Sequence, residues 1–139
     1  MLVVNQIIRS ELFPAHFPPE LASAAFVTGN EAAWRPMLAA AAVEWLGANG
    51  YAVLGTELWV LKAGAIQSLP IGQSGMPEVH GNTVNRESEE PWSSFVVRAA
   101  TETQTYLQSF NPADIVEQGE LHFNVVWVSE AQYAELTSW

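Results

Sequence analysis

The chain has no cysteine, few basic residues and no hydrophobic run long enough to cross a membrane. Without cysteine it can form neither a disulfide nor a thiolate metal site, and this composition fits a reducing compartment. The purest apolar run, MLAAAAV at residues 37–43, ends at Glu44, whereas a membrane helix needs about 20 apolar residues. The first residues, MLVVNQIIRSELF, lack the basic start and long apolar core of a signal peptide. We therefore expect a cytoplasmic protein.

Basic residues are scarce, because five Lys and Arg stand against fifteen Asp and Glu, which gives a net charge of −10. Binding to nucleic-acid phosphate or to an anionic membrane relies on basic side chains, so the composition argues against both partners. An acidic surface instead attracts a basic macromolecule and speeds their encounter. No Lys or Arg follows Arg98, so the C-terminal part is the most acidic. The simpler interpretation, that the acidity only maintains solubility, stays open.

The composition and length predict one globular domain spanning residues 1–139, because 49% of the residues are hydrophobic. The segment YAVLGTELWVL (residues 51–61) is apolar on both alternating faces, which predicts a strand covered on both sides. Gly55 suggests a bulge or the close approach of another backbone. A bulge would shift the alternation of side chains after it, which leaves open the face on which Glu57 lies. Glu57 is then either a solvent-exposed carboxylate or a half-buried acid held for a partner. A turn at residues 62–64 and a short antiparallel strand at residues 65–69 complete a predicted hairpin.

Two segments predict long helices. The first begins at Asn30 or shortly after it and runs to about Leu46, with Trp34 in its apolar stripe. Pro36 suits a first helical turn, which would leave residues 31–35 as a separate turn or a kinked start. The second helix covers residues 92–110, and its apolar residues follow three-four spacing typical of a core-facing stripe. Ser88 or Glu89 would cap it, with Pro91 in its first turn.

Shorter elements are predicted towards the ends of the chain. Pro19 opens a short helix, LHFNVVWV (residues 121–128) is a second strand, and Ser129-x-x-Gln132 matches the capping box of a final short helix. Residues 1–12 fit a strand or a helix equally well. The sequence therefore predicts an α+β fold, in which a small, mainly antiparallel sheet is covered by two main helices with short terminal helices in addition.

The chain carries no recognisable catalytic or metal-binding motif. Its histidines, His16, His80 and His122, are far apart, and there is no HExxH pair, carboxylate-rich calcium loop, P-loop or GxSxG elbow. We therefore expect no catalytic site, no cofactor and no metal. An enzyme working through Glu57, Glu78 or His80 remains the least favoured alternative.

Residues 70–91 form an irregular stretch rich in proline, glycine and polar residues. Ordered loops of this length are uncommon, so the stretch is either a mobile connector or a recognition loop. Together with acids elsewhere, its polar residues are the expected contacts for a basic partner. This expected contact set consists of Glu57, Glu78, His80, Arg86, Glu87, Glu89, Glu90, Asp114, Glu117 and Glu120.

Part of the chain resembles the immunity protein 40 family of bacterial polymorphic-toxin systems. The resemblance lies in a helix followed by GYAVLGTELWVL, the turn KAG with a short strand, and PWSSFVVRAATETQTYL after an irregular loop. It covers roughly residues 34–110, about half the chain. It implies a small cytosolic antidote that binds and blocks one cognate toxin, with no catalytic residues. A generic ligand-binding or scaffold domain is the alternative, and the oligomeric state is left open.

Overall fold

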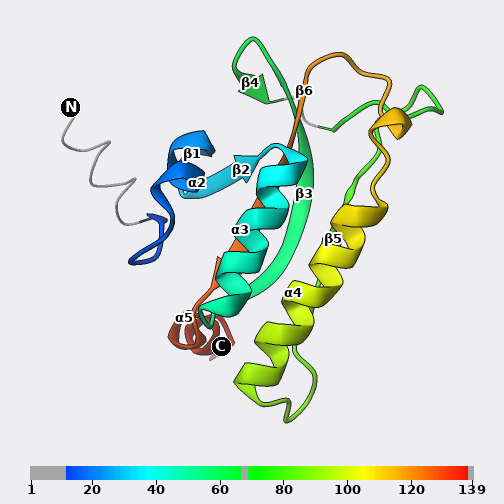
Figure 1. The fold of residues 1–139 in the computed structure, drawn as a ribbon. Helices are drawn as coiled ribbons and strands as arrows, with labels where there is room; N and C mark the ends of the chain where they lie inside the picture. The colour runs from blue at the N-terminus through cyan, green and yellow to red at the C-terminus, as the bar shows by residue number, and fades with distance from the viewer. Residues whose placement is uncertain (1–11, 67–68, 138–139) are drawn as a thin grey trace.

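The computed structural model describes residues 12–66 and 69–137, and the strands among them form one antiparallel sheet (Figure 1). The sheet has the order β1-β2-β6-β3-β4, and β5 also pairs with β3. Every strand pair is antiparallel. The strands are β1 (Phe26–Thr28), β2 (Glu31–Trp34), β3 (Ala52–Lys62), β4 (Ala65–Ile66), β5 (Gly81–Thr83) and β6 (Glu120–Val128).

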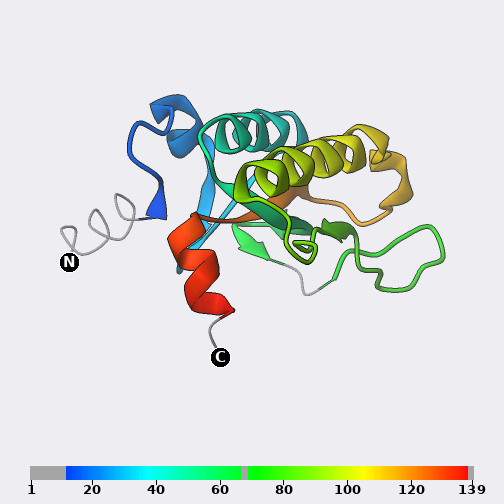
Figure 2. The same cartoon turned by 90° about the horizontal axis from the view of Figure 1, so that it is seen from below.

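Two long helices, α3 (Pro36–Ala48) and α4 (Trp92–Ser109), lie side by side on one face of this sheet (Figures 1 and 2). The shorter helices are α2 (Pro19–Ala24) and α5 (Glu130–Leu136), and a 3-10 turn, η1, spans Pro112–Asp114. Figure 2 shows that α5 projects on the side of the sheet away from α3 and α4. The predicted α+β fold with two covering helices is thus confirmed. Among the described residues, none of the helices combines the length and apolar character needed to cross a bilayer.

The core lies between the helical layer and the sheet, and its largest fully buried side chains include Trp34, Leu46, Phe95 and Phe123. Phe123 packs edge-to-face against Tyr106 and Phe110, at the C-terminal part of α4 and just beyond it. Because side chains alternate along a strand, burial of Phe123 under the helices directs its neighbours on β6 to the opposite face.

The central strand β3 contains the bulge that Gly55 suggested, because its register against β6 shifts between Val53 and Gly55. The glycine also serves a close approach: a Cβ at position 55 would lie 2.3 Å from the backbone oxygen of Asn82 on β5. Past the bulge, Leu58 is buried in the core while Glu57 is exposed. Glu57 is therefore a carboxylate on the solvent side of the sheet.

The prediction for residues 31–35 was wrong. Residues Glu31–Trp34 form strand β2, which pairs with β1 on one side and β6 on the other, and α3 begins only at Pro36. Trp34 therefore belongs to the sheet, where its indole N–H donates to the backbone oxygen of Leu21 at 2.7 Å. Pairing with β6 buries the strand, and such tertiary burial outweighs local helix propensity. The β1–β2 hairpin was not predicted.

Residues 70–91 are irregular as predicted, but they also contain β5, which the sequence did not indicate. Pro91 is the N-cap of α4 rather than part of its first turn, and neither Ser88 nor Glu89 caps the helix. At the other end, the capping box of Ser129 and Gln132 is formed as predicted. The predicted hairpin is confirmed, because Ala65–Ile66 form β4, which pairs antiparallel with the end of β3. The strand does not extend to Leu69, which lies in a bend, and residues 67–68 lie outside the described residues, as do residues 1–11.

Candidate functional site

The sheet face opposite α3 and α4 gathers polar side chains from three strands. In the strand register, Asn124 on β6 lies directly opposite Glu57 on β3, and His122 lies opposite Trp59. On its other side Asn124 is paired with Ala33 of β2, two residues beyond Glu31. We call the group of Glu31, Glu57, Trp59, His122 and Asn124 the open sheet face, because α3 and α4 do not cover it. Glu31 and Glu57 are exposed, whereas Trp59, His122 and Asn124 are buried.

Asn124 is the buried centre of the open sheet face, with only 3% of its surface exposed. Its amide nitrogen donates to Glu31 Oε1 at 3.3 Å, which fixes the orientation of the amide, because the reverse orientation would oppose two oxygens. Its Oδ1 atom has no hydrogen-bond partner among the described residues. A buried acceptor without a donor is unusual and costs free energy.

His122 adds a second acceptor on the same strand. It is 7% exposed, and its Nδ1 atom has no partner among the described residues. Burial lowers the pKa of His122, with a smaller contribution from the charge of Arg35, while the backbone and charge of Glu120 oppose the shift. The ring is therefore neutral at neutral pH, and Nδ1 can accept a hydrogen bond when Nε2 carries the proton.

Glu57 supplies the exposed carboxylate of the open sheet face. Its Oε1 accepts a hydrogen bond from the indole nitrogen of Trp59 at 3.1 Å. The Trp59 ring in turn meets Phe26 of β1 edge-to-face, with centroids 6.4 Å apart. The face therefore combines carboxylates, an amide oxygen and an imidazole nitrogen with an aromatic border.

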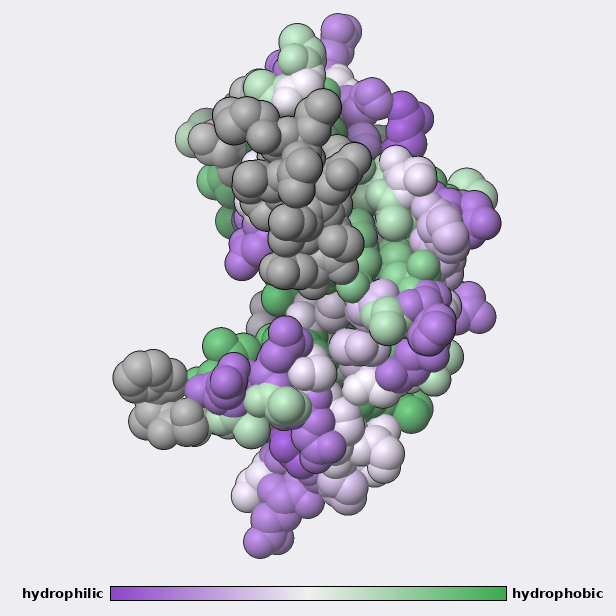
Figure 3. Space-filling model, turned by 90° about the vertical axis from the view of Figure 1, so that its left-hand side faces the viewer, coloured by the Kyte–Doolittle hydropathy of each residue, from purple (hydrophilic) through white to green (hydrophobic). Residues whose placement is uncertain are grey.

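A groove of about 500 Å³ adjoins Glu31 and Asn124. It lies between the β1–β2 turn, the C-terminal half of β6 and the start of α5, and the outline of the molecule is hollowed beside α5 (Figure 3). The residues that line it include Leu12, Asn30, Glu31, Asn124, Val126 and Gln132. The groove gives a ligand access to the Glu31 end of the open sheet face.

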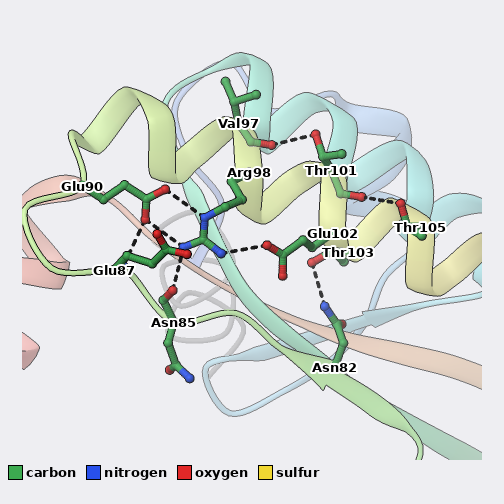
Figure 4. A network of polar contacts seen from close by, with 10 residues as sticks. All are labelled: Asn82, Asn85, Glu87, Glu90, Val97, Arg98, Thr101, Glu102, Thr103 and Thr105. Atoms are coloured by element: carbon green, nitrogen blue, oxygen red, sulfur yellow. Dashed lines mark hydrogen bonds and ion pairs between the residues drawn. The ribbon is translucent and has the colours of Figure 1, made fainter.

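Glu90, another expected contact, is instead part of a network before and within α4 (Figure 4). Two nitrogens of Arg98 donate to its two carboxylate oxygens, each at 2.8 Å. Arg98 also donates to Glu102 and to the backbone oxygen of Asn85. The hydrogen bonds from Arg98 are the main cause that lowers the pKa of Glu90 to about 2. This network fastens the loop before α4 to the helix.

The neighbours of Glu90 complete this loop. Arg86 donates to the Glu90 backbone oxygen, and its guanidinium lies over the rings of Trp92 and Tyr133. Glu87 forms a turn with Glu90 through its backbone. Glu89 is exposed in the left-handed region, with φ of 63°.

Glu78 and His80 belong to a different cluster, in the loop after β4. Glu78 accepts from Ser74 Oγ at 2.9 Å and lies 3.1 Å from His80 Nε2. These two contacts, the one with Ser74 first, lower the pKa of Glu78. A nucleophilic serine needs a base at its hydroxyl, but here the serine donates to a carboxylate that is already held by the histidine. We therefore interpret these contacts as structural, stabilising the conformation of the loop after β4.

The remaining expected contacts follow α4. Glu117 is partly buried, with only 7% of its side chain exposed. One of its carboxylate oxygens accepts from the Ile71 backbone N–H at 3.0 Å, and the other pairs with Lys62 Nζ at 3.2 Å. Glu120 pairs with Arg35 on the surface. Asp114 is exposed in η1.

The expected contact set is thus divided among separate places. The group of Arg86, Glu87, Glu89 and Glu90 precedes α4, whereas Asp114 and Glu117 follow it, at opposite ends of an 18-residue helix (Figure 1). Only Glu57 belongs to the open sheet face. Sequence reasoning did not select Glu31, Trp59, His122 or Asn124, although the alternation of residues 121–128 already placed His122 and Asn124 on one face.

Within the described part of the chain, no three His, Asp or Glu side chains gather closely enough to hold a metal ion. Comparisons of the chain with protein-family models, with curated proteins and with solved structures found no match.

Proposed function

We propose that this protein is an immunity protein that binds and neutralises a cognate bacterial toxin with a basic surface. The proposal rests on the sequence resemblance and on how charge is distributed in the fold. A binding protein of this kind acts by occupying the surface that the toxin uses, and its acids replace the phosphate or other anion that the toxin would contact.

The observation that carries the proposal is that the described basic side chains are paired with other groups of the same protein. Of the five Lys and Arg residues, Arg9 lies outside the described residues. The other four all contact carboxylates, backbone oxygens or aromatic rings of the protein. These contacts join Arg35 to Glu120, Lys62 to Glu117, Arg98 to Glu90 and Glu102, and Arg86 to the Glu90 backbone, Trp92 and Tyr133.

Several carboxylates are left without a Lys or Arg partner among the described residues, including Glu31, Glu57 and Glu89. Their charge can be compensated only from outside the described part of the chain. A basic protein partner supplies that compensation and gains a faster encounter from it.

The proposal predicts that a toxin domain is encoded next to this gene, and that domain is the partner to use in the test. The purified pair should form a complex, and co-expression should rescue cells that the toxin alone kills. A specific complex should bury roughly 1,200–2,000 Å² in total. Absence of association between the purified pair, with the toxin shown to be active, would contradict the proposal.

A scaffold domain within a larger assembly is the second candidate, because the outer face of α3 is apolar. Met37 is 87% exposed, and Leu38 is also exposed. A groove between α3 and α4 adds Ala48 and Val97 to this surface, beside polar residues such as Glu44, Thr101 and Gln104. An exposed helix face that is largely apolar is often covered by a partner. Light scattering distinguishes the two candidates: a stable oligomer that Met37→Glu converts to a monomer would favour the scaffold.

A further inference from the structure

We propose that the open sheet face is a receptor for an arginine side chain of the partner protein. This inference rests on the proposed function in one respect, namely that the partner is a basic protein. It adds the place of contact and the chemical group that is recognised, both of which can be tested on the isolated protein.

The first ground is an excess of hydrogen-bond acceptors. Asn124 Oδ1 and His122 Nδ1 are buried and lack partners among the described residues. Among the described residues, the carboxylate of Glu31 accepts only the long 3.3 Å contact from Asn124, and that of Glu57 accepts only from the indole of Trp59. Unsatisfied buried acceptors are costly, so the site favours a guest that brings donors and no acceptors.

The second ground is charge. Glu31 and Glu57 have no Lys or Arg partner among the described residues, and His122 is held neutral by burial. Arg35, which directly follows β2, is already paired with Glu120. The guest should therefore carry positive charge, and charge-assisted hydrogen bonds to it are the strong ones.

The third ground is the spacing of the acceptors. Neighbouring strands lie about 4.8 Å apart, so Asn124 on β6 stands between Glu57 on β3 and Glu31 on β2. A guanidinium offers five N–H donors in a planar fork and can reach more than one acceptor at once, whereas an ammonium is a compact point charge. Phe26, which is partly exposed, and the buried Trp59 adjoin the site, and the Phe26 ring is the aromatic surface against which a guanidinium can pack.

The experiment uses the full chain and a small probe in place of the toxin. N-acetyl-arginine methylamide is titrated into the protein while NMR follows the Trp59 indole N–H and the Asn124 side-chain amide. The probe should shift both signals saturably. The citrulline counterpart, which has nearly the same shape but no charge, should bind about tenfold more weakly or not at all, as should the lysine counterpart.

Variants locate the binding. Glu57→Gln and Glu31→Gln should each weaken arginine binding several-fold, whereas Glu44→Gln removes an exposed acid of α3 and should leave it unchanged. The backbone spectrum of each variant checks that the fold is intact. Unmoved Trp59 and Asn124 signals, equal binding of citrulline or lysine, or an equal loss with Glu44→Gln would each overturn the proposal.

The outcome is separable from that for the proposed function. If the toxin binds but the arginine probe does not, the arginine site is wrong and the immunity function stands. If the probe binds but no toxin does, the site stands as an arginine receptor and the toxin assignment is wrong.

Discussion

Asn82 on β5 donates its side-chain amide to the hydroxyl of Thr103, 3.0 Å away on the buried side of α4 (Figure 4). The oxygen of the same amide accepts from Thr56 on β3 at 2.6 Å. A single asparagine thus connects the central strand to the helix that covers it. This short polar chain crosses a core whose buried side chains are mainly apolar.

Thr103→Val should therefore destabilise the protein. It keeps the shape of the side chain but leaves a donor of Asn82 unpaired, which costs about 1–3 kcal/mol. Thr105→Val is the matched control, because the Thr105 hydroxyl is exposed and only donates to the backbone oxygen of Thr101. Urea denaturation measures both. Equal, small changes for the two variants would show that the Asn82 contact is not needed.

Gly47 permits the close approach of α3 and α4. A Cβ at this position would lie only 2.7 Å from the Cβ of Ala100. Gly47→Ala should gain helix propensity of about 1 kcal/mol, yet the overpacking should cost about 1–3 kcal/mol. We expect net destabilisation of up to about 2 kcal/mol, and Ala100→Gly in the same chain should recover the loss of packing. A more stable Gly47→Ala protein would mean that the helices separate freely.

The pair of Glu90 and Arg98 should make stability depend on acid pH. The pKa of Glu90 falls from 4.5 to about 2 in the folded protein. Its contribution is therefore complete above about pH 4.5 and is lost as the pH falls towards 2. Glu90→Gln should lower the melting temperature at neutral pH and flatten its decline across this window. Glu89→Gln is the control, because Glu89 is exposed beside it. Parallel pH profiles for the Glu90→Gln and wild-type proteins would contradict this assignment.

Glu117 should anchor the loop after β4. Because its carboxylate accepts the Ile71 N–H and pairs with Lys62, Glu117→Gln should speed amide hydrogen exchange at Ile71. Asp114→Asn changes an exposed acid nearby and should leave that rate unchanged. Exchange at Ile71 that is equally slow in both variants would show that the loop is held by its other contacts.

Association with a basic toxin should depend on salt. Raising the ionic strength should slow association and leave dissociation largely unchanged, because exposed charges steer the encounter and are screened beyond about 10 Å at 0.1 M. Stopped-flow mixing at several salt concentrations measures both rates. An association rate independent of salt would remove electrostatic steering from the proposal.

The sequence predicted correctly those helices and strands whose hydrophobic pattern lies entirely within their own residues. The β3 strand, the β6 strand and the α4 helix were predicted within a few residues, and the capping box of Ser129 and Gln132 was formed as expected. Even the bulge at Gly55 had a local sign, since glycine inside a strand pattern marks such irregularities. In contrast, β2 and β5 are short, and each forms a strand by pairing with a longer one, β6 or β3 respectively.

The sequence by itself determined the acidity of the protein, its apolar periodicities and therefore the α+β class, because these depend on composition and on neighbours along the chain. Only the tertiary structure decided that Glu31 meets Asn124, a residue 93 positions away, and that Asn124 faces Glu57. It also decided that Glu90 forms an ion pair with Arg98 and that Glu117 forms one with Lys62. The physical reason is that hydrogen bonds and ion pairs depend on distances of a few ångströms, which strand pairing sets and sequence spacing does not.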